Sequence, residues 1–338
     1  MGLLTSASRR RRADTFPNYA LLEPRDIVAQ AEQKTRKLES IYHLSQKHAW
    51  DGRKVLSDLL EKHGGIDIPE EKREAIARVF SIILWGELAA WIVSAELAEN
   101  IDDVEAKMAA TSQTFDEARH FYVMRDYLNE LGVEIPPLDA YSRVVLREVL
   151  DTDNLAFKLV GMQLLVENVA LSLFKMVAKA RIEPVLSDLM PYFEKDEARH
   201  VGLGINYLPK LIEQMSWMEV ARLNVYQARI YTLLFWGSML QREDFDELGL
   251  DANDSTRFGL RTQLDIATRM GKFGAGDGQR VGRGVYVEPE FIRKTHSFSI
   301  DAFMPHPGAE ISGWQRRVLG VARRAARAGA RVMDAVDA

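Results

Sequence analysis

The sequence contains no cysteine, which excludes disulfide bonds and metal sites built on thiolates. It also has no convincing run of alternating apolar and polar residues, which argues against β-strands. No basic segment near Met1 leads into an apolar stretch, and Arg9–Arg12 are followed by residues that do not continue as a twin-arginine signal. We therefore expect a cytoplasmic protein without a secretory signal.

The composition is that of an ordinary soluble chain. Its 338 residues are 47% hydrophobic and 28% charged, and the formal net charge is −5. A chain of this length can bury one large core or two smaller ones. We expect no nucleic-acid partner.

Two apolar runs stand out, residues 79–95 and 159–174, and each carries a single charged residue at its centre, Glu87 or Glu167. Both runs resemble membrane spans in length and apolarity. However, an acidic side chain at the middle of a bilayer costs about 2.5–3.5 kcal/mol. We interpret both runs as buried helices whose one charged side chain is a ligand.

A repeated motif occupies the middle of the chain. The pentapeptide Asp-Glu-Ala-Arg-His occurs at residues 116–120 and again at 196–200, and an earlier glutamate precedes the glutamate of each copy by the same interval. Each of these residues in the second copy lies 80 positions after its counterpart in the first copy, as 167 follows 87 and 197 follows 117. The candidate metal ligands are Glu87, Glu117, His120, Glu167, Glu197 and His200.

The spacing of these six residues favours a site for two metal ions. In Glu-x-x-His both side chains share a helix face, about 5–6 Å apart, so they can bind one ion together. The interval from 87 to 117, or from 167 to 197, fits an antiparallel hairpin, with about 14 residues on each side of a turn at 100–103 or 181–184. Four buried carboxylates are costly unless two divalent ions neutralise them. Oxygen and imidazole ligands suit iron or manganese.

Two simpler interpretations stay open from the sequence. A single Glu-x-x-His on a helix is usually a solvated pair, and a duplicated bundle could have lost its metal. The apolar surroundings of Glu87 and Glu167 argue against both, because an unpaired buried carboxylate is expensive.

Helical signals dominate the whole chain. We predict an N-terminal tail (1–24), a helical bundle (25–271), and a glycine-rich loop followed by a basic amphipathic helix (272–338). The expected helices, with Pro209 a candidate kink, are at about 26–62, 69 to beyond Glu87, 103–131, 140–150, 154–180, 184 to beyond His200, 216–245 and 311–338.

The last of these helices is strongly basic. It contains six arginines before its first acidic residue, Asp334, and apolar residues recur along it from Trp314 onward. Such a helix either docks on a partner or an anionic membrane surface, or packs on the acidic bundle of its own chain. The sequence leaves both alternatives open.

At the six ligand positions the chain resembles the ferritin-like di-iron carboxylate superfamily, over roughly residues 25–245. The two pentapeptides are most similar to the hydroxylase subunits of bacterial multicomponent monooxygenases. The resemblance implies an all-α fold: a ferritin-like four-helix bundle core with additional helices and a C-terminal basic helical extension. It also implies charged residues that support the ligands, namely Asp116 paired with His200, Asp196 paired with His120, and Arg119 and Arg199 nearby.

The same resemblance suggests pocket residues. Gly86, Ala90 and Gln113 stand where that family lines its substrate pocket, and Leu171 replaces its usual threonine. Met124 stands where the ribonucleotide reductase small subunit carries its radical tyrosine. A radical-storing role is therefore not expected.

The resemblance implies a non-haem di-iron oxidase or monooxygenase that activates O₂ to hydroxylate, desaturate or N-oxidise a small hydrophobic substrate. The cofactor would be two iron ions, or manganese with iron. No flavin, haem or iron–sulfur motif is visible, so electrons would come from a separate reductase or ferredoxin; a homodimer is compatible with such a bundle. The alternatives are a ferroxidase or peroxide-reducing iron-handling protein, and a metal-bearing bundle that binds a ligand or partner without turnover.

Overall fold

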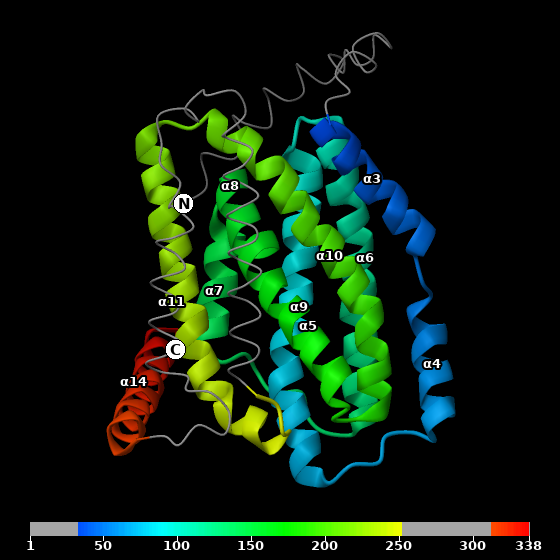
Figure 1. The fold of residues 1–338 in the computed structure, drawn as a ribbon, viewed down its shortest axis with the longest axis vertical. Helices are drawn as coiled ribbons and strands as arrows, with labels where there is room; N and C mark the ends of the chain where they lie inside the picture. The colour runs from blue at the N-terminus through cyan, green and yellow to red at the C-terminus, as the bar shows by residue number, and fades with distance from the viewer. Residues whose placement is uncertain (1–32, 252–311, 338) are drawn as a thin grey trace.

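The structure, a computed structural model, describes residues 33–251 and 312–337 (Figure 1). Over these residues the chain is helical and has no strand, which confirms the all-α fold class. The predicted tail at 1–24 and the glycine-rich part of the segment that follows residue 271 lie outside the described residues.

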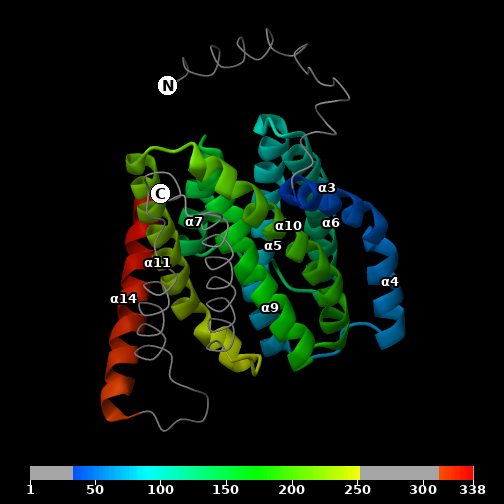
Figure 2. The same ribbon diagram turned by 45° about the horizontal axis from the view of Figure 1, so that its top comes forward.

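Two antiparallel helical hairpins form the core bundle (Figures 1 and 2). The first joins α5 (Glu70–Asn100) to α6 (Val104–Leu131). The second joins α9 (Glu167–Ala180) to α10 (Pro184–Glu213). Each hairpin carries one copy of the repeated motif, as the constant interval between the paired glutamates predicts.

Side-chain caps fix the start of the second helix in each hairpin. Asp103 accepts a backbone N–H hydrogen bond at the start of α6. Glu183 accepts the N–H groups of Val185 and Leu186 at the start of α10, and its carboxylate also accepts the hydroxyl of Tyr127 at 3.1 Å. Because Glu183 is fully buried, these bonds hold the turn of the second hairpin against α6 of the first.

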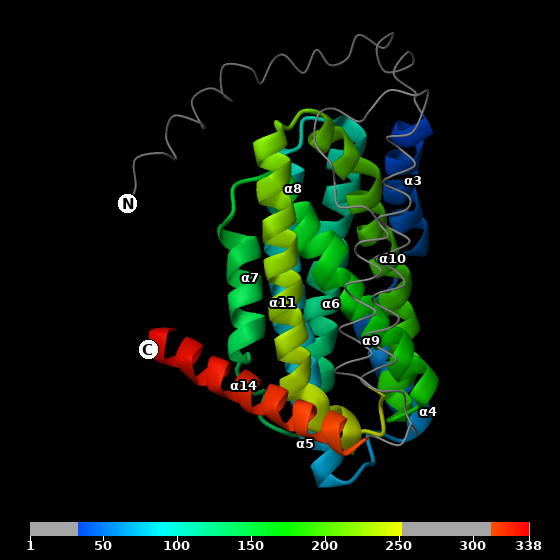
Figure 3. The same ribbon diagram turned by 60° about the vertical axis from the view of Figure 1, so that its left-hand side comes forward.

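Further helices flank this core: α3 (Gln33–His48), α4 (Gly52–His63), α7 (Ala140–Asp151), α11 (Trp217–Glu247) and α14 (Gly313–Asp337). Helices α3 and α4 lie against α6 and α10, whereas α7 and α11 lie against α5. Figure 3 shows α14 crossing α11 and α7 near one end of the bundle. The predicted additional helices and C-terminal helical extension are confirmed, and α14 packs on its own chain.

The helical region predicted at about 26–62 consists, in its described part, of two helices, α3 and α4. Asp51 accepts a hydrogen bond from the backbone N–H of Lys54, at 3.0 Å, and its own backbone is extended. An N-cap in this conformation starts a new helix and cannot continue the previous one. The interruption brings Trp50 to the level of the repeated motif, where its indole N–H donates to Asp196.

The helix predicted at 154–180 is continuous but not α-helical throughout. It consists of α8 (Leu155–Lys158), the π-helical segment η2 (Leu159–Val166) and α9. π-helical turns occur often at functional sites, and Glu167 is the first residue after this one. Helix α10 runs through Pro209 to Glu213, so this proline does not end it.

A surface network joins α4 to α10. Asp188 of α10 accepts hydrogen bonds from Lys62 at 2.7 Å and pairs with His63 at 2.8 Å, both on α4, and it also pairs with Arg181. The hydrogen bond from Lys62, followed by that from Arg181, holds the pKa of Asp188 well below its usual value.

The apolar core is divided by a polar layer into two clusters. In α5, buried residues between 75 and 84 belong to one cluster and those between 89 and 101 to the other, with Glu87 between them. In α6 the two sets lie between 106 and 110 and between 123 and 131. The repeated motif therefore lies between two layers of apolar side chains.

Two helices, α5 and the segment Leu155–Ala180, are long and apolar enough to cross a membrane by length and composition. The most apolar windows of these helices are 61% and 78% buried inside the protein. Burial by neighbouring helices is the arrangement expected of bundle core helices, as we predicted for residues 79–95 and 159–174.

Candidate dimetal centre

The structure brings the six candidate ligands together at the level between the two apolar clusters. Their ligand atoms fall into two groups, and within each group the atoms lie within 4.8 Å of one another. The first group contains Glu87 and His120, the second contains Glu167 and His200, and both contain Glu117 and Glu197. All six side chains are at most 4% exposed.

Each imidazole turns Nδ1 toward the carboxylates. In the second group, Nδ1 of His200 is 3.0 Å from Glu117 Oε1, 3.1 Å from Glu167 Oε2 and 3.2 Å from Glu197 Oε2. One N–H cannot donate to three carboxylates at once. Glu117 Oε2 is buried and has no hydrogen-bond partner. These atoms therefore fit a shared cation, and a set of carboxylate oxygens with one imidazole per ion suits iron or manganese.

Burial perturbs the carboxylates strongly. It raises the pKa of Glu167 well above its usual value, and the charges of Glu197 and Glu117 raise it further. Burial likewise raises the pKa of Glu87, against the opposing effect of His120. Burial thus favours the protonated form of these two glutamates, and metal binding would be coupled to the release of protons.

The outer nitrogens of the imidazoles face aspartates from the opposite copy of the motif. Nε2 of His120 lies 3.1 Å from Asp196 Oδ2, and Nε2 of His200 lies 3.5 Å from Asp116 Oδ2. This is the crossed pairing that the family resemblance implies. Burial raises the pKa of Asp196, but the hydrogen bond and charge of His120 outweigh burial and hold that pKa well below its usual value. Ionised aspartates in these places fix the orientation of the rings.

Two buried arginines complete this network. Nη2 of Arg119 lies 2.5 Å from Asp116 and 2.7 Å from Asp196. Nη2 of Arg199 lies 3.0 Å from Asp116 and also pairs with Asp196. If Glu87 and Glu167 are protonated and both imidazoles are charged, the ten buried groups have no net charge. They also have no net charge when two divalent ions are bound, all six carboxylates are ionised and both imidazoles are neutral.

Sequence reasoning missed two residues of this network. Ser45 of α3 donates its hydroxyl to Asp116 Oδ2 at 2.9 Å. Trp50 donates its indole N–H to Asp196 Oδ2 at 2.8 Å, and its ring lies 4.8 Å from the guanidinium carbon of Arg119. Both come from the α3–α4 region, which carries no part of the repeat, so no motif spacing pointed to them.

The internal symmetry of the centre is broken one turn before each Glu-x-x-His. In α6 this position is Gln113, whose Nε2 donates to Glu117 Oε1 at 3.0 Å and to Glu167 Oε1 at 2.6 Å. In α10 the equivalent position is Phe193, which stacks on His120 with ring centroids 4.4 Å apart. The two metal groups therefore have different surroundings. The amide of Gln113 is bonded to two of the ligands, and its assignment to the substrate pocket stays a prediction.

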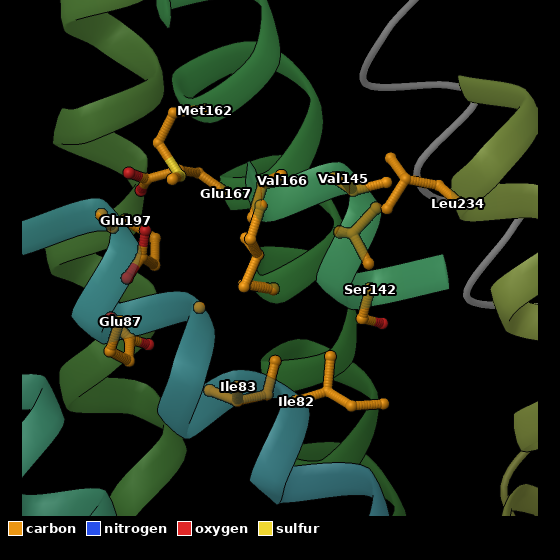
Figure 4. Close-up of a pocket in the computed structure, with 15 residues that line it drawn as sticks. Ile82, Ile83, Glu87, Ser142, Val145, Met162, Val166, Glu167, Glu197 and Leu234 are labelled. Atoms are coloured by element: carbon orange, nitrogen blue, oxygen red, sulfur yellow. The ribbon is translucent and has the colours of Figure 1, made fainter. Parts of the chain in front are cut away.

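An apolar chamber opens beside the ligands (Figure 4). Its volume is about 70 Å³ and three of the ligands, Glu87, Glu167 and Glu197, form part of its wall. As predicted, Gly86 and Ala90 also line it. From α9 the chamber is lined by Glu167, Val169 and Ala170, and the assignment of Leu171 to the pocket stays a prediction.

A second cavity of about 150 Å³ continues the chamber between α5, α7, α9 and α11. The two cavities share the lining residues Ile82, Ile83, Ser142, Val169 and Leu234. The first is mostly apolar, whereas the second also contains polar side chains, including Ser172, Ser238 and Gln241. Together the linings of the two cavities extend from the candidate ligands to α11.

Comparison with solved structures identifies the fold. A protein with aldehyde deformylating oxidase activity from Synechococcus is 17% identical, with a TM-score of 0.54, over 67% of this chain and 98% of that chain. An R2-like ligand-binding oxidase with a Mn/Fe cofactor is 14% identical, with a TM-score of 0.57, over 70% and 92%. A dimanganese NrdF from Streptococcus sanguinis is 12% identical, with a TM-score of 0.57, over 69% and 88%.

At these identities the likeness establishes a shared fold, the ferritin-like helical bundle. No protein-family model and no curated protein matches the chain. None of these three structures is named as a hydroxylase subunit of a multicomponent monooxygenase, so that subgroup stays a prediction.

Proposed function

We propose that the protein is an O₂-dependent dimetal oxidoreductase that oxidises a small hydrophobic organic molecule. The observation that carries the proposal is the apolar chamber whose wall includes three of the six ligands. A substrate in this chamber would lie directly beside the metal ions. Two iron ions, or manganese with iron, would supply the binding and reduction of O₂.

The side chains of the centre have separate tasks in this proposal. Glu117 and Glu197 belong to both groups of ligands and would hold both ions. Each remaining Glu and His pair would complete one ion's coordination. The aspartates and arginines behind the imidazoles keep the rings in place, and the apolar clusters above and below the layer exclude water.

The shape of the chamber and its continuation favours an elongated, mostly apolar substrate. Two structural neighbours support an oxidase that acts on an organic ligand, because one is named for aldehyde deformylating oxidase activity and another as a ligand-binding oxidase. The proposal includes a separate electron donor, a reductase or ferredoxin, since turnover of O₂ needs electrons. Met124 is fully buried one turn after His120, so the chain offers no phenol at that position.

An iron-handling role is the second candidate. The apolar lining of the chamber argues against it, because a hydrated ferrous ion would have to pass apolar side chains to reach the ligands through this space. Variants that fill the chamber separate the two functions.

The test uses Gly86→Leu, with Gly86→Ala as the matched control. A Cβ added at Gly86 meets no atom within 4 Å, so the larger side chain extends into the chamber without a clash at its base. We expect Gly86→Leu to bind two metal ions per chain but to lose the acceleration of O₂ consumption by medium-chain alkyl substrates. Gly86→Ala should retain that acceleration.

Oxygen uptake after anaerobic loading with ferrous iron measures both effects. If no alkyl substrate accelerates uptake in the wild type, and ferrous iron alone is oxidised over many turnovers equally in all three proteins, the iron-handling role replaces the oxidase. If none consumes O₂, the bundle only binds a ligand or partner.

A further inference from the structure

The inner face of α14 is fixed to the body of the protein. Three of its small or apolar residues are buried in the contact with α7 and α11: Leu319, Ala322 and Ala326. The hydroxyl of Tyr141 on α7 donates to the carbonyl of Ala326 at 3.0 Å. At the edge of the contact, Arg327 pairs with Glu243 of α11 at 2.7 Å. Helix α14 is thus a docked helix with a defined outer face.

The outer face combines large apolar residues with arginines. Trp314 is 65% exposed, Val321 is 57% exposed and Val332 is 64% exposed. Three of the exposed arginines of α14, namely Arg317, Arg324 and Arg331, lie beside these apolar residues. Seven residues make about two helical turns, so residues seven apart lie on the same side of a helix. Trp314 and Val321 are seven residues apart, and the three arginines also follow one another at intervals of seven. The two sets form adjacent lines along α14.

The charge of this face is positive, and the described residues do not neutralise it. Within residues 33–251 and 312–337, no carboxylate pairs with Arg317, Arg324 or Arg331. Asp334 pairs instead with Arg143 of α7 at 2.6 Å. The face therefore presents three uncompensated guanidinium groups on a protein whose net charge is −5.

We propose that the outer face of α14 binds the surface of an anionic phospholipid bilayer. Guanidinium groups match lipid phosphates in geometry and charge, and tryptophan favours the interface between headgroups and acyl chains. The helix has 25 residues, so the face is about 37 Å long and suits an extended surface. A second copy of α14 would bring like charges together, so its binding is disfavoured.

Helix α14 packs on the helix, α11, that forms part of the wall of the second cavity. Helix α14 packs on one side of α11 through Met239 and Ala326. Other residues of α11, including Tyr231, Leu234 and Gln241, line the second cavity. A bilayer held by α14 would therefore lie near the wall of the cavity that leads to the metal ligands. The binding surface itself does not depend on the proposed function and is tested with metal-free protein.

The test is sedimentation of the full chain with phosphatidylcholine vesicles, with and without phosphatidylglycerol, at low and high salt. The charge variant is Arg317→Gln/Arg324→Gln/Arg331→Gln. Its matched control removes three exposed cationic side chains from α3 and α4, in Arg36→Gln/Lys47→Gln/Arg53→Gln. Each arginine near an anionic surface strengthens binding about fivefold, so the charge variant should bind on the order of 100-fold more weakly.

A second variant, Val321→Gln/Val332→Gln, tests the apolar contribution while the charge of the face is unchanged. The proposal predicts binding only to phosphatidylglycerol vesicles, weakened by salt, lost in both α14 variants and retained in the control. Circular dichroism shows whether each variant is folded. Absence of wild-type binding, or equal weakening by the control, overturns the proposal. If the wild type binds no vesicles but forms a dimer that dissociates in the valine variant, the face binds a second copy of the protein. This outcome also overturns the proposal.

Discussion

Replacement of Asp196 by asparagine is the sharpest test of the buried network behind the metal ligands. The carboxylate of Asp196 accepts the indole N–H of Trp50, pairs with Arg119 at 2.7 Å and with Arg199, and lies 3.1 Å from Nε2 of His120. Asparagine keeps the shape but removes the charge. Both arginines are buried, so one positive charge is left buried and uncompensated.

Removing one partner of a buried ion pair usually costs about 3–5 kcal/mol. We therefore expect Asp196→Asn to lower the free energy of unfolding of the metal-free protein by about 3–5 kcal/mol. Loss of the partner of His120 should also weaken metal binding about 10–100-fold. Trp50→Phe removes one donor to the same carboxylate and leaves the charges balanced, so its effect on stability should be smaller.

Urea unfolding in the presence of a chelator measures the first effect, and anaerobic titration with ferrous iron measures the second. Asp188→Asn is a suitable surface control, because its network lies at the α4–α10 surface. An Asp196→Asn protein as stable as the wild type would show that the buried charges are not balanced in the way that the structure indicates.

The remaining predictions concern the ligands, their asymmetry and acid stability. Glu117→Ala should lose both metal ions, whereas Glu87→Ala should weaken chiefly the binding of one ion. Metal content per chain after anaerobic loading measures both effects. Identical losses in the two variants would contradict the shared role of Glu117. Gln113→Leu should weaken binding of the ion beside His200 about 10–100-fold and affect binding of the other ion little. In a calorimetric titration with ferrous iron, the two binding steps should then lie further apart. The folded-state pKa of Asp188 is depressed, so its contribution to stability is present above pH ~3.9 and is lost as pH falls through the folded-state value. Asp188→Asn should therefore be less stable at neutral pH, by about 1 kcal/mol, and its stability should fall less steeply below pH ~4; parallel curves would contradict this.

The positions of the six ligands were predictable because they depend on regular helix geometry. The spacing within Glu-x-x-His specifies a helix face, and the constant interval between the paired glutamates specifies a hairpin; both are local properties of the chain. The structure places Glu87, Glu117, Glu167 and Glu197 at one level for this reason. The crossed pairing of aspartates and imidazoles came from the family resemblance and not from spacing.

The surroundings of the ligands were less predictable because they depend on tertiary packing. Ser45 and Trp50 reach the network only because α3 and the turn after it lie across α6 and α10. Gln113 has the polarity of a pocket residue, yet its amide turns to two ligands. The π-helical turn before Glu167 also has no signature in the apolar run that contains it.

The most direct test of the dimetal centre is anomalous diffraction at the iron edge from crystals grown anaerobically with ferrous iron. We predict two neighbouring peaks between the shared carboxylates of Glu117 and Glu197, one beside His120 and the other beside His200. No peak at this level of the bundle, or iron bound only at the surface, would contradict the assignment.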